Sequence, residues 1–209
     1  MRHRPLPYDA EAARTHLMKA DPVMRGIIER VGPLAIETRG EPYEALLRSV
    51  LYQQLAGAAA AAIERRVLAL FDDQIPSPTQ LASVSDEALR GAGLSRQKAS
   101  YLRSIGEHFA SGELDNRALR RAPDEQVIED VTRIKGVGRW TADMLLIFCL
   151  GRADVLPVGD LGVRNSMQQA YRLEDPPDAE TMERIAECWR PYRSAGTWYL
   201  WRRGDVVTL

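Results

Sequence analysis

One short segment combines residue types and a spacing that suit the binding of a phosphate. Residues 134–142 place Gly136 and Gly138 on either side of Val137. Two glycines permit a tight turn with positive φ, and the apolar residue between them can pack between the flanking helices. The second helix then begins with unpaired N–H groups. In a nucleic acid, such groups can hold a backbone phosphate without contacting the neighbouring base. The residues predicted to bind the phosphate backbone are Lys135, Gly136, Val137, Gly138, Arg139 and Thr141. A plain glycine-terminated helix followed by a second helix is the alternative.

Asp160 is the acidic residue whose position suits catalysis. It follows Gly138 by 22 residues, enough chain for one helix and a return loop that bring its carboxylate back beside the turn. A carboxylate there can stabilise positive charge in a transition state and can orient or deprotonate a water molecule. An aspartate before a helix is also a common N-cap, so capping is the alternative role.

The elements that must position these residues are predicted to be helices. Apolar residues recur at helical spacing along almost the whole chain, and no alternating segment is flanked by hairpin turns, so we predict an all-α fold. The predicted helices cover residues 42–71, about 85–90, 95–109, about 124–136, 139–148, a stretch that begins at 160, about 180–189 and about 194–201. Residues 152–159 are predicted to form a non-helical link, and residues 89–93 repeat the Gly-x-Gly pattern of residues 134–138.

Composition and charge exclude several classes of protein. The 209 residues are 45% hydrophobic and 27% charged, which favours a globular fold with a buried core. A net charge of −1 argues against a purely electrostatic nucleic-acid binder, yet residues 95–105, 131–142 and 189–203 contain basic side chains and no acidic ones. These stretches could also be solvated helix faces.

Membrane, secreted and cysteine-rich classes are not expected. The apolar run 144–150 is too short to span a membrane, and the N-terminus lacks the apolar region of a secretory signal. Cys149 and Cys188 are expected to be reduced thiols in packed helices, because two separated cysteines form no disulfide framework, zinc site or cluster. We therefore expect an intracellular, cytoplasmic protein.

Four segments in order resemble the helix-hairpin-helix DNA glycosylases, in particular the branch that removes 3-methyladenine and related alkylated bases. Residues 43–55 resemble the family's early helix and the loop that enters DNA, and residues 93–99 its next helix junction. Residues 134–142 resemble its hairpin, and residues 156–163 the segment that carries its catalytic aspartate, here Asp160. The resemblance covers about residues 20–205 and implies two helical lobes that share a cleft, one formed by residues 43–150 and the other by residues 1–42 and 151–209.

The resemblance also implies roles for individual side chains. Asp160 would be the catalytic carboxylate. Trp140 and Trp201 match base-pocket tryptophans, and further walls could come from Tyr52, Met144, Trp198 and Tyr199; a core aromatic cluster is the alternative, above all for Trp198 and Tyr199. An aromatic pocket would favour the positive charge of an alkylated purine. The residues predicted to fill the gap left by a flipped base are Gln53, Gln54 and Leu55, with Gln54 or Leu55 as the plug.

The expected activity is hydrolysis alone. Bifunctional relatives place a lysine at the hairpin position that Trp140 occupies here, so we expect no Schiff base and no strand cleavage. No cofactor is expected, because an iron–sulfur cluster needs four clustered cysteines, although the hairpin carbonyls could coordinate a monovalent cation. The expected partner is damaged double-stranded DNA, bound by a monomer. The alternatives are a non-catalytic DNA-binding module, a glycosylase of different base specificity, and an α-helical scaffold in which the Gly-x-Gly turns are incidental.

Overall fold

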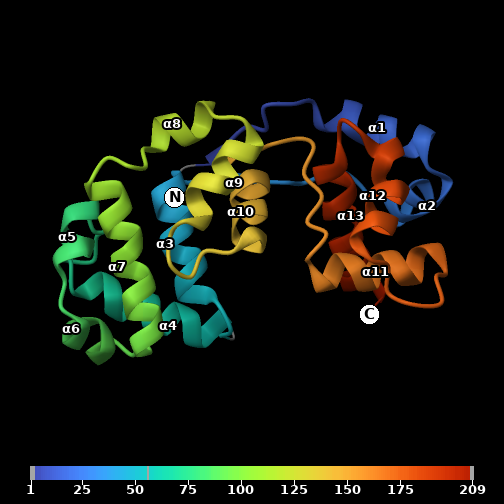
Figure 1. Cartoon of the computed structure of the whole chain (residues 1–209). Coiled ribbons are helices and arrows are strands. Elements are labelled where there is room, and N and C mark those ends of the chain that lie inside the picture. Colours follow the sequence, from blue (N-terminus) through green and yellow to red (C-terminus); the bar gives the residue numbers. More distant parts are fainter. Residues whose placement is uncertain (1–2, 56, 208–209) are drawn as a thin grey trace. The chain divides into compact units, whose positions relative to one another are not determined.

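A computed structural model describes residues 3–55 and 57–207, and helices dominate it (Figure 1). The prediction of an all-α fold is confirmed. Among the described residues the one sheet is a pair of two-residue antiparallel strands, β1 (His3–Arg4) and β2 (Thr38–Arg39), with His3 opposite Arg39. Strands of two residues are too short to produce an alternating sequence pattern, which explains why the sequence did not indicate them.

The chain divides into two compact units. The terminal unit consists of Met1–Arg39 and Leu146–Leu209, and the central unit consists of Gly40–Leu145. Within the described residues, no helix is both long enough and apolar enough to cross a membrane.

The terminal unit is a helical cluster around one apolar core. Its elements are α1 (Ala10–Ala20), α2 (Pro22–Val31), the π-helical turn η1 (Leu146–Leu150), α11 (Leu161–Tyr171), α12 (Ala179–Ala186), the 3₁₀ turn η2 (Glu187–Trp189) and α13 (Arg193–Val207). Helix α13 packs against both α2 and α11. Trp189 and Tyr199 are the largest of its fully buried side chains, and the core also includes Leu17, Met24 and Leu200.

A buried aspartate ties the terminal unit together. The side chain of Asp21 caps α2 by accepting from the N–H groups of Val23 and Met24 at 2.8 and 3.1 Å. Its second oxygen accepts from the Trp189 indole N–H at 2.8 Å and from the Tyr171 hydroxyl. Such a carboxylate is fully used in holding four groups from three elements, so we assign it a structural role.

The central unit contains the predicted hairpin. Its elements are α3 (Pro42–Tyr52), α4 (Gly57–Ala69), α5 (Pro78–Ser83), α6 (Asp86–Gly91), α7 (Arg96–Ala110), α8 (Asn116–Arg121), α9 (Asp124–Thr132) and α10 (Arg139–Leu145). Helices α5 and α7 lie side by side (Figure 1), because Gly106 carries no side chain: a Cβ there would lie 2.6 Å from the backbone nitrogen of Ala82. Helix α3 packs against α4, α7 and α10.

Predicted helix starts are confirmed where a side chain caps the helix. Ser85 accepts from the Ala88 N–H at the start of α6, and Ser95 accepts from the Lys98 N–H at the start of α7, both at 3.1 Å. Local capping depends on residues three positions apart, so the sequence alone reveals it.

The prediction of one continuous helix over residues 42–71 is wrong. Helix α3 ends at Tyr52 and α4 begins at Gly57. The Lys98 ammonium from α7 donates to the carbonyl of Leu51 at 2.8 Å, which satisfies a carbonyl that a continuous helix would have paired. Alanine-rich sequence favours helix, but this distant contact stabilises the break instead.

Smaller differences concern helix ends and one cysteine. Helix α9 stops at Thr132 rather than at residue 136, and the helix predicted through residue 148 is α10 followed in sequence by the π-helical turn η1. Both cysteines are free; Cys149 is buried as expected, whereas Cys188 is exposed.

Candidate functional site

The turn between α9 and α10 has the geometry that its glycines predict. Gly136 has a φ of +84°, and the N–H of Val137 donates to the carbonyl of Ile134 at 3.0 Å. The Val137 side chain is buried, whereas Gly138 is exposed. The first bond of α10 runs from the Ala142 N–H to the Gly138 carbonyl at 3.1 Å, so this turn delivers the chain directly into the first turn of the helix.

Helix α7 contacts this turn through two of its side chains. The ring of Tyr101 lies against Gly136 so closely that a Cβ on the glycine would be 2.2 Å from a ring carbon. The hydroxyl of Ser104 accepts from the backbone N–H of Lys135 at 3.2 Å. Only glycine therefore meets both requirements at position 136, the left-handed conformation and the close approach of an aromatic ring. Neither Tyr101 nor Ser104 was identified from the sequence, because both are distant from the turn along the chain.

The loop after α3 contacts the same turn. The Gln53 side-chain amide donates to the carbonyl of Gly136 at 3.1 Å. Gln54 has a φ of +56°, and both Gln54 and Leu55 are exposed, Leu55 to 37%. Of the three residues predicted to enter DNA, Gln53 is thus hydrogen-bonded within the protein, whereas Gln54 and Leu55 are exposed.

A hollow of about 400 Å³ lies in the central unit between this loop and α10. It is lined by Ser49, Tyr52, Gln53, Gln54 and Trp140. Trp140 is 46% exposed, which is unusually high for a tryptophan in a folded protein. Two of the predicted pocket residues, Tyr52 and Trp140, therefore meet in one hollow, whereas Met144 is half-buried on α10 and does not line it.

The cationic side chains of the turn differ in their surroundings. Arg139 donates to the buried carboxylate of Asp143 at 2.9 Å, while most of the arginine side chain stays exposed. Burial raises the pKa of Asp143, and the hydrogen bond and charge of Arg139 offset part of that rise. Lys135 is exposed and forms no ion pair with any residue that the structure describes. Thr141 is buried in the first turn of α10.

Asp160, in the terminal unit, is the N-cap of α11 and is 9% exposed. Its Oδ1 accepts from the N–H of Val163 at 2.8 Å and from the indole N–H of Trp201 at 3.0 Å. A Cβ on Gly162 would lie 3.1 Å from the same oxygen and 3.5 Å from the Trp201 ring. The residue therefore caps its helix, as the alternative interpretation holds, but its carboxylate is also oriented by a donor from another helix.

The two C-terminal tryptophans have different environments. Trp201 is half-buried and stacks on Phe148, with ring centroids 5.6 Å apart and an interplanar angle of 27°. Trp198 is buried in the apolar core of the terminal unit, against Tyr199, and the guanidinium of Arg202 lies 5.5 Å from its ring centroid. These surroundings fit the core-aromatic alternative for Trp198 and Tyr199. They place Trp201 directly beside Asp160.

The link that precedes Asp160 is fixed to the start of α13. Arg193 donates to the Asp154 carboxylate at 2.7 and 3.0 Å and to its backbone carbonyl at 3.0 Å. The Ser194 hydroxyl accepts from the Val155 N–H and donates to the carbonyl of Arg152. Burial acts to raise the pKa of Asp154, but the hydrogen bonds and charges of Arg193 and Arg190 outweigh it, so this pKa lies below its ordinary value.

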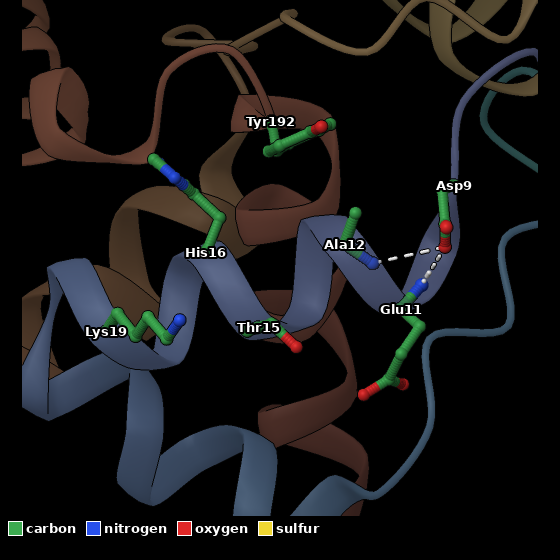
Figure 2. A pocket seen from close by; sticks show the side chains of 7 residues that line it. All are labelled: Asp9, Glu11, Ala12, Thr15, His16, Lys19 and Tyr192. Carbon is green, nitrogen blue, oxygen red and sulfur yellow. Dashed lines mark hydrogen bonds between the residues drawn. The ribbon is translucent and has the colours of Figure 1, made fainter.

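A second hollow of about 510 Å³ runs along α1 in the terminal unit. Figure 2 shows its lining residues: Asp9, Glu11, Ala12, Thr15, His16, Lys19 and Tyr192. Three of its polar side chains have partners: Asp9 caps α1, Glu11 pairs with Arg14 and His16 contacts the carbonyl of Cys188. None of the residues predicted from the sequence lies there.

The family model described as HhH-GPD superfamily base excision DNA repair protein matches residues 47–191. This match spans well over half of the chain and includes both the hairpin and Asp160. The chain belongs to the HhH-GPD superfamily.

Individual HhH-GPD relatives match over nearly the whole chain. DNA-3-methyladenine glycosylase 1 of Schizosaccharomyces pombe is 37% identical over 93% of this chain and 88% of its own length. The solved structure of S. pombe 3-methyladenine DNA glycosylase in complex with abasic DNA superimposes with a TM-score of 0.80 over 91% of this chain and 95% of that one. DNA-3-methyladenine glycosidase from Bacillus halodurans is 36% identical, with a TM-score of 0.85 over 100% of this chain and 95% of that one. The resemblance inferred from the sequence is confirmed.

Proposed function

We propose that this HhH-GPD protein is a monofunctional DNA glycosylase that hydrolyses the N-glycosidic bond of alkylated purines and leaves an abasic site. The observation that carries the proposal is the buried Asp160 carboxylate, oriented by the N–H of Val163 and the indole of Trp201. The names of the similar proteins, which are 3-methyladenine glycosylases, support the class of substrate.

Asp160 is proposed as the catalytic carboxylate. Cleavage of the N-glycosidic bond builds positive charge on the deoxyribose, and a fixed negative charge beside it lowers the barrier. The same carboxylate can orient or deprotonate the water that attacks the sugar. We assign no separate acid for the departing base, because a cationic alkylated purine leaves as a neutral molecule without being protonated.

The extruded base is proposed to enter the hollow lined by Tyr52 and Trp140. An aromatic face attracts a cation through its quadrupole, so the positive charge of an alkylated purine is favoured over a neutral base. In the terminal unit, we propose that Trp201, whose indole N–H donates to Asp160, also contacts the substrate.

The hairpin and the loop after α3 are proposed to hold the DNA. Backbone N–H groups of the glycine turn and the exposed Lys135 suit a phosphate. Gln54 and Leu55 are exposed at the loop, so we propose them as the plug for the vacated stack, whereas Gln53 braces the loop against Gly136. The partner would be damaged duplex DNA, bound by a monomer within the cell.

The absence of a lyase step follows from Trp140. An indole forms no Schiff base with the sugar, so the product is expected to be an intact strand with an abasic site.

Base release from defined duplexes tests the proposal. Each duplex contains 3-methyladenine, 7-methylguanine, 1,N6-ethenoadenine, hypoxanthine or uracil, and strand breaks are measured with and without hot alkali. We expect breaks from the alkylated purines only after alkali. Asp160→Asn should lower the single-turnover rate by about 10²–10³-fold, as for the loss of other electrostatic stabilisers, and should still bind abasic DNA.

Asp178→Asn is the matched control, because Asp178 also caps a helix, α12, through the N–H of Thr181 at 2.9 Å. It should keep full activity. Strand breaks without alkali would contradict the monofunctional proposal. Binding of abasic DNA with no release of any base would leave a DNA-binding module without catalysis.

A further inference from the structure

Tyr52 forms one wall of the hollow, and two charged residues that do not line the hollow contact its side chain. The Tyr52 hydroxyl donates to Oε2 of Glu64 at 2.7 Å. Arg48 pairs with Oε1 of the same carboxylate at 3.1 Å, and its guanidinium carbon lies 5.6 Å from the centroid of the Tyr52 ring. The Glu64 side chain is only 15% exposed. We call Arg48, Tyr52 and Glu64 the Tyr52 network; Arg48 and Tyr52 come from α3 and Glu64 from α4.

A hydrogen bond from a phenol to a carboxylate changes the phenol ring. The bond is charge-assisted, so it is short and strong, and it fixes the ring orientation. Donation of this hydrogen bond leaves more electron density on the phenol oxygen, and the oxygen passes part of it to the ring. The effect is larger in a low-dielectric setting. Relative to a tyrosine without this acceptor, the ring is more negative and attracts a cation more strongly, while the Arg48 guanidinium, 5.6 Å from the ring centroid, acts in the opposite direction.

Arg48 limits the effect of Glu64 to this ring. A buried, unpaired carboxylate beside a DNA site would repel the phosphates and would be costly to desolvate. The ion pair with Arg48 nearly cancels the long-range charge of Glu64, while the short hydrogen bond to the phenol remains.

We infer that Glu64 is a positioning residue that, through Tyr52, makes the hollow select cationic bases over their neutral parents. The inference rests on the proposed function, in which the extruded base enters this hollow. It assigns a part of the lesion specificity to a glutamate that does not line the hollow itself. A network that only braced α3 against α4 would affect the binding of cationic and neutral bases equally.

The test measures binding, so that it is separate from catalysis. Two duplexes differ only in one nucleotide, 2′-fluorinated 7-methylguanine or 2′-fluorinated guanine; the fluorine disfavours positive charge on the sugar and keeps the glycosidic bond intact. Fluorescence anisotropy gives the two dissociation constants, and their ratio is the preference for the cation. Glu64→Gln and Tyr52→Phe should each reduce the preference about two- to fivefold, the range of one cation–π contact. The double variant should lose no more than either single variant.

Glu107→Gln, at an exposed glutamate of α7, is the control and should leave the preference unchanged. Tyr52→Phe keeps the packing of the ring, so it decides the question if Glu64→Gln proves unstable in a thermal melt. An unchanged preference in Tyr52→Phe, or no preference in the unmodified protein, would overturn the inference. Release of ordinary 7-methylguanine by the unmodified protein tests the proposed function independently.

Discussion

At the scale of single residues, the carboxylate of Asp160 accepts a hydrogen bond from a donor on another helix. The Val163 N–H comes from the helix that Asp160 caps, and any N-cap aspartate has such a partner. The indole N–H of Trp201 at 3.0 Å is the additional contact, and the stack on Phe148 fixes its ring. Trp201 therefore acts on the orientation of the carboxylate, and it can do so without touching the base.

Trp201→Phe separates these two roles. The phenyl ring can still stack on Phe148, but the donor to Asp160 is lost. Because a hydrogen bond to a charged group contributes about 1.5–3 kcal/mol, we expect the single-turnover rate of base release to fall about 10- to 100-fold. The dissociation constant for the lesion duplex should change little. Trp198→Phe, which alters a core tryptophan, should lower the melting temperature and leave the rate nearly intact. Weaker binding with an unchanged rate in Trp201→Phe would instead assign Trp201 to the base pocket alone.

The sequence was informative about Asp160 and the hairpin, because both depend on residues near one another in the chain. It could not separate Trp198 from Trp201, since both lie on α13 and only the packing of other elements makes one a core residue and the other a neighbour of Asp160. Glu64 and Tyr101 were missed for the same reason. Their partners, Tyr52 and Gly136, are 12 and 35 positions away, so no local pattern marks them.

At the scale of elements, contacts across the chain decide where helices stop. The sequence predicted the helix starts at Ser85 and Ser95 because the capping bonds are local. It did not predict the end of α3, where Lys98 satisfies the Leu51 carbonyl and Gln53 turns to the Gly136 carbonyl. This break exposes Gln54 and Leu55, so the proposed DNA-entering loop exists because of tertiary contacts.

The link before Asp160 is also held by contacts between residues distant in the chain. Its ion pair predicts that the stability of the fold depends on pH. The pKa of Asp154 lies below its ordinary value of 3.8, so the folded state binds its proton less readily than the unfolded state. The stabilisation is then present above about pH 4 and is lost as the pH falls below it. Asp154→Asn should lower the free energy of unfolding by about 1–3 kcal/mol at pH 7. The difference from the unmodified protein should shrink as the pH falls below 3.8.

Urea denaturation followed by circular dichroism at several pH values measures this effect. Asp175→Asn, at an exposed aspartate of the terminal unit, is the control and should leave the midpoint unchanged. A constant difference between Asp154→Asn and the unmodified protein down to pH 3 would show that Asp154 acts through contacts that do not depend on its charge. No difference at any pH would show that the neutral contacts of Ser194 hold the link.

At the scale of the whole molecule, net charge conceals how the chain can bind a polyanion. Lysine and arginine number 28 and aspartate and glutamate 29, so the overall field offers no attraction to DNA. At least five of the eight arginines in the basic stretches are paired within the protein: Arg103 with Asp86, Arg133 with Glu129, Arg139 with Asp143, and both Arg190 and Arg193 with Asp154. These pairs support the solvated-face interpretation for much of the basic sequence. Lys135, exposed beside the glycine turn, is outside these pairs, so a phosphate contact can depend on it.

The salt dependence of DNA binding tests whether that local charge matters more than the total. Each phosphate that a cation neutralises releases condensed counterions, so the slope of log K against log salt concentration reports the number of such contacts. Lys135→Gln should weaken binding to abasic duplexes of different sequence alike and should reduce the slope by about 1. Arg133→Gln removes the same charge two residues earlier, but Arg133 is already paired with Glu129 and Asp130, so its slope should change by much less. Equal reductions in both variants would mean that the total charge of the surface governs binding, and that the hairpin holds its phosphate through backbone N–H groups alone.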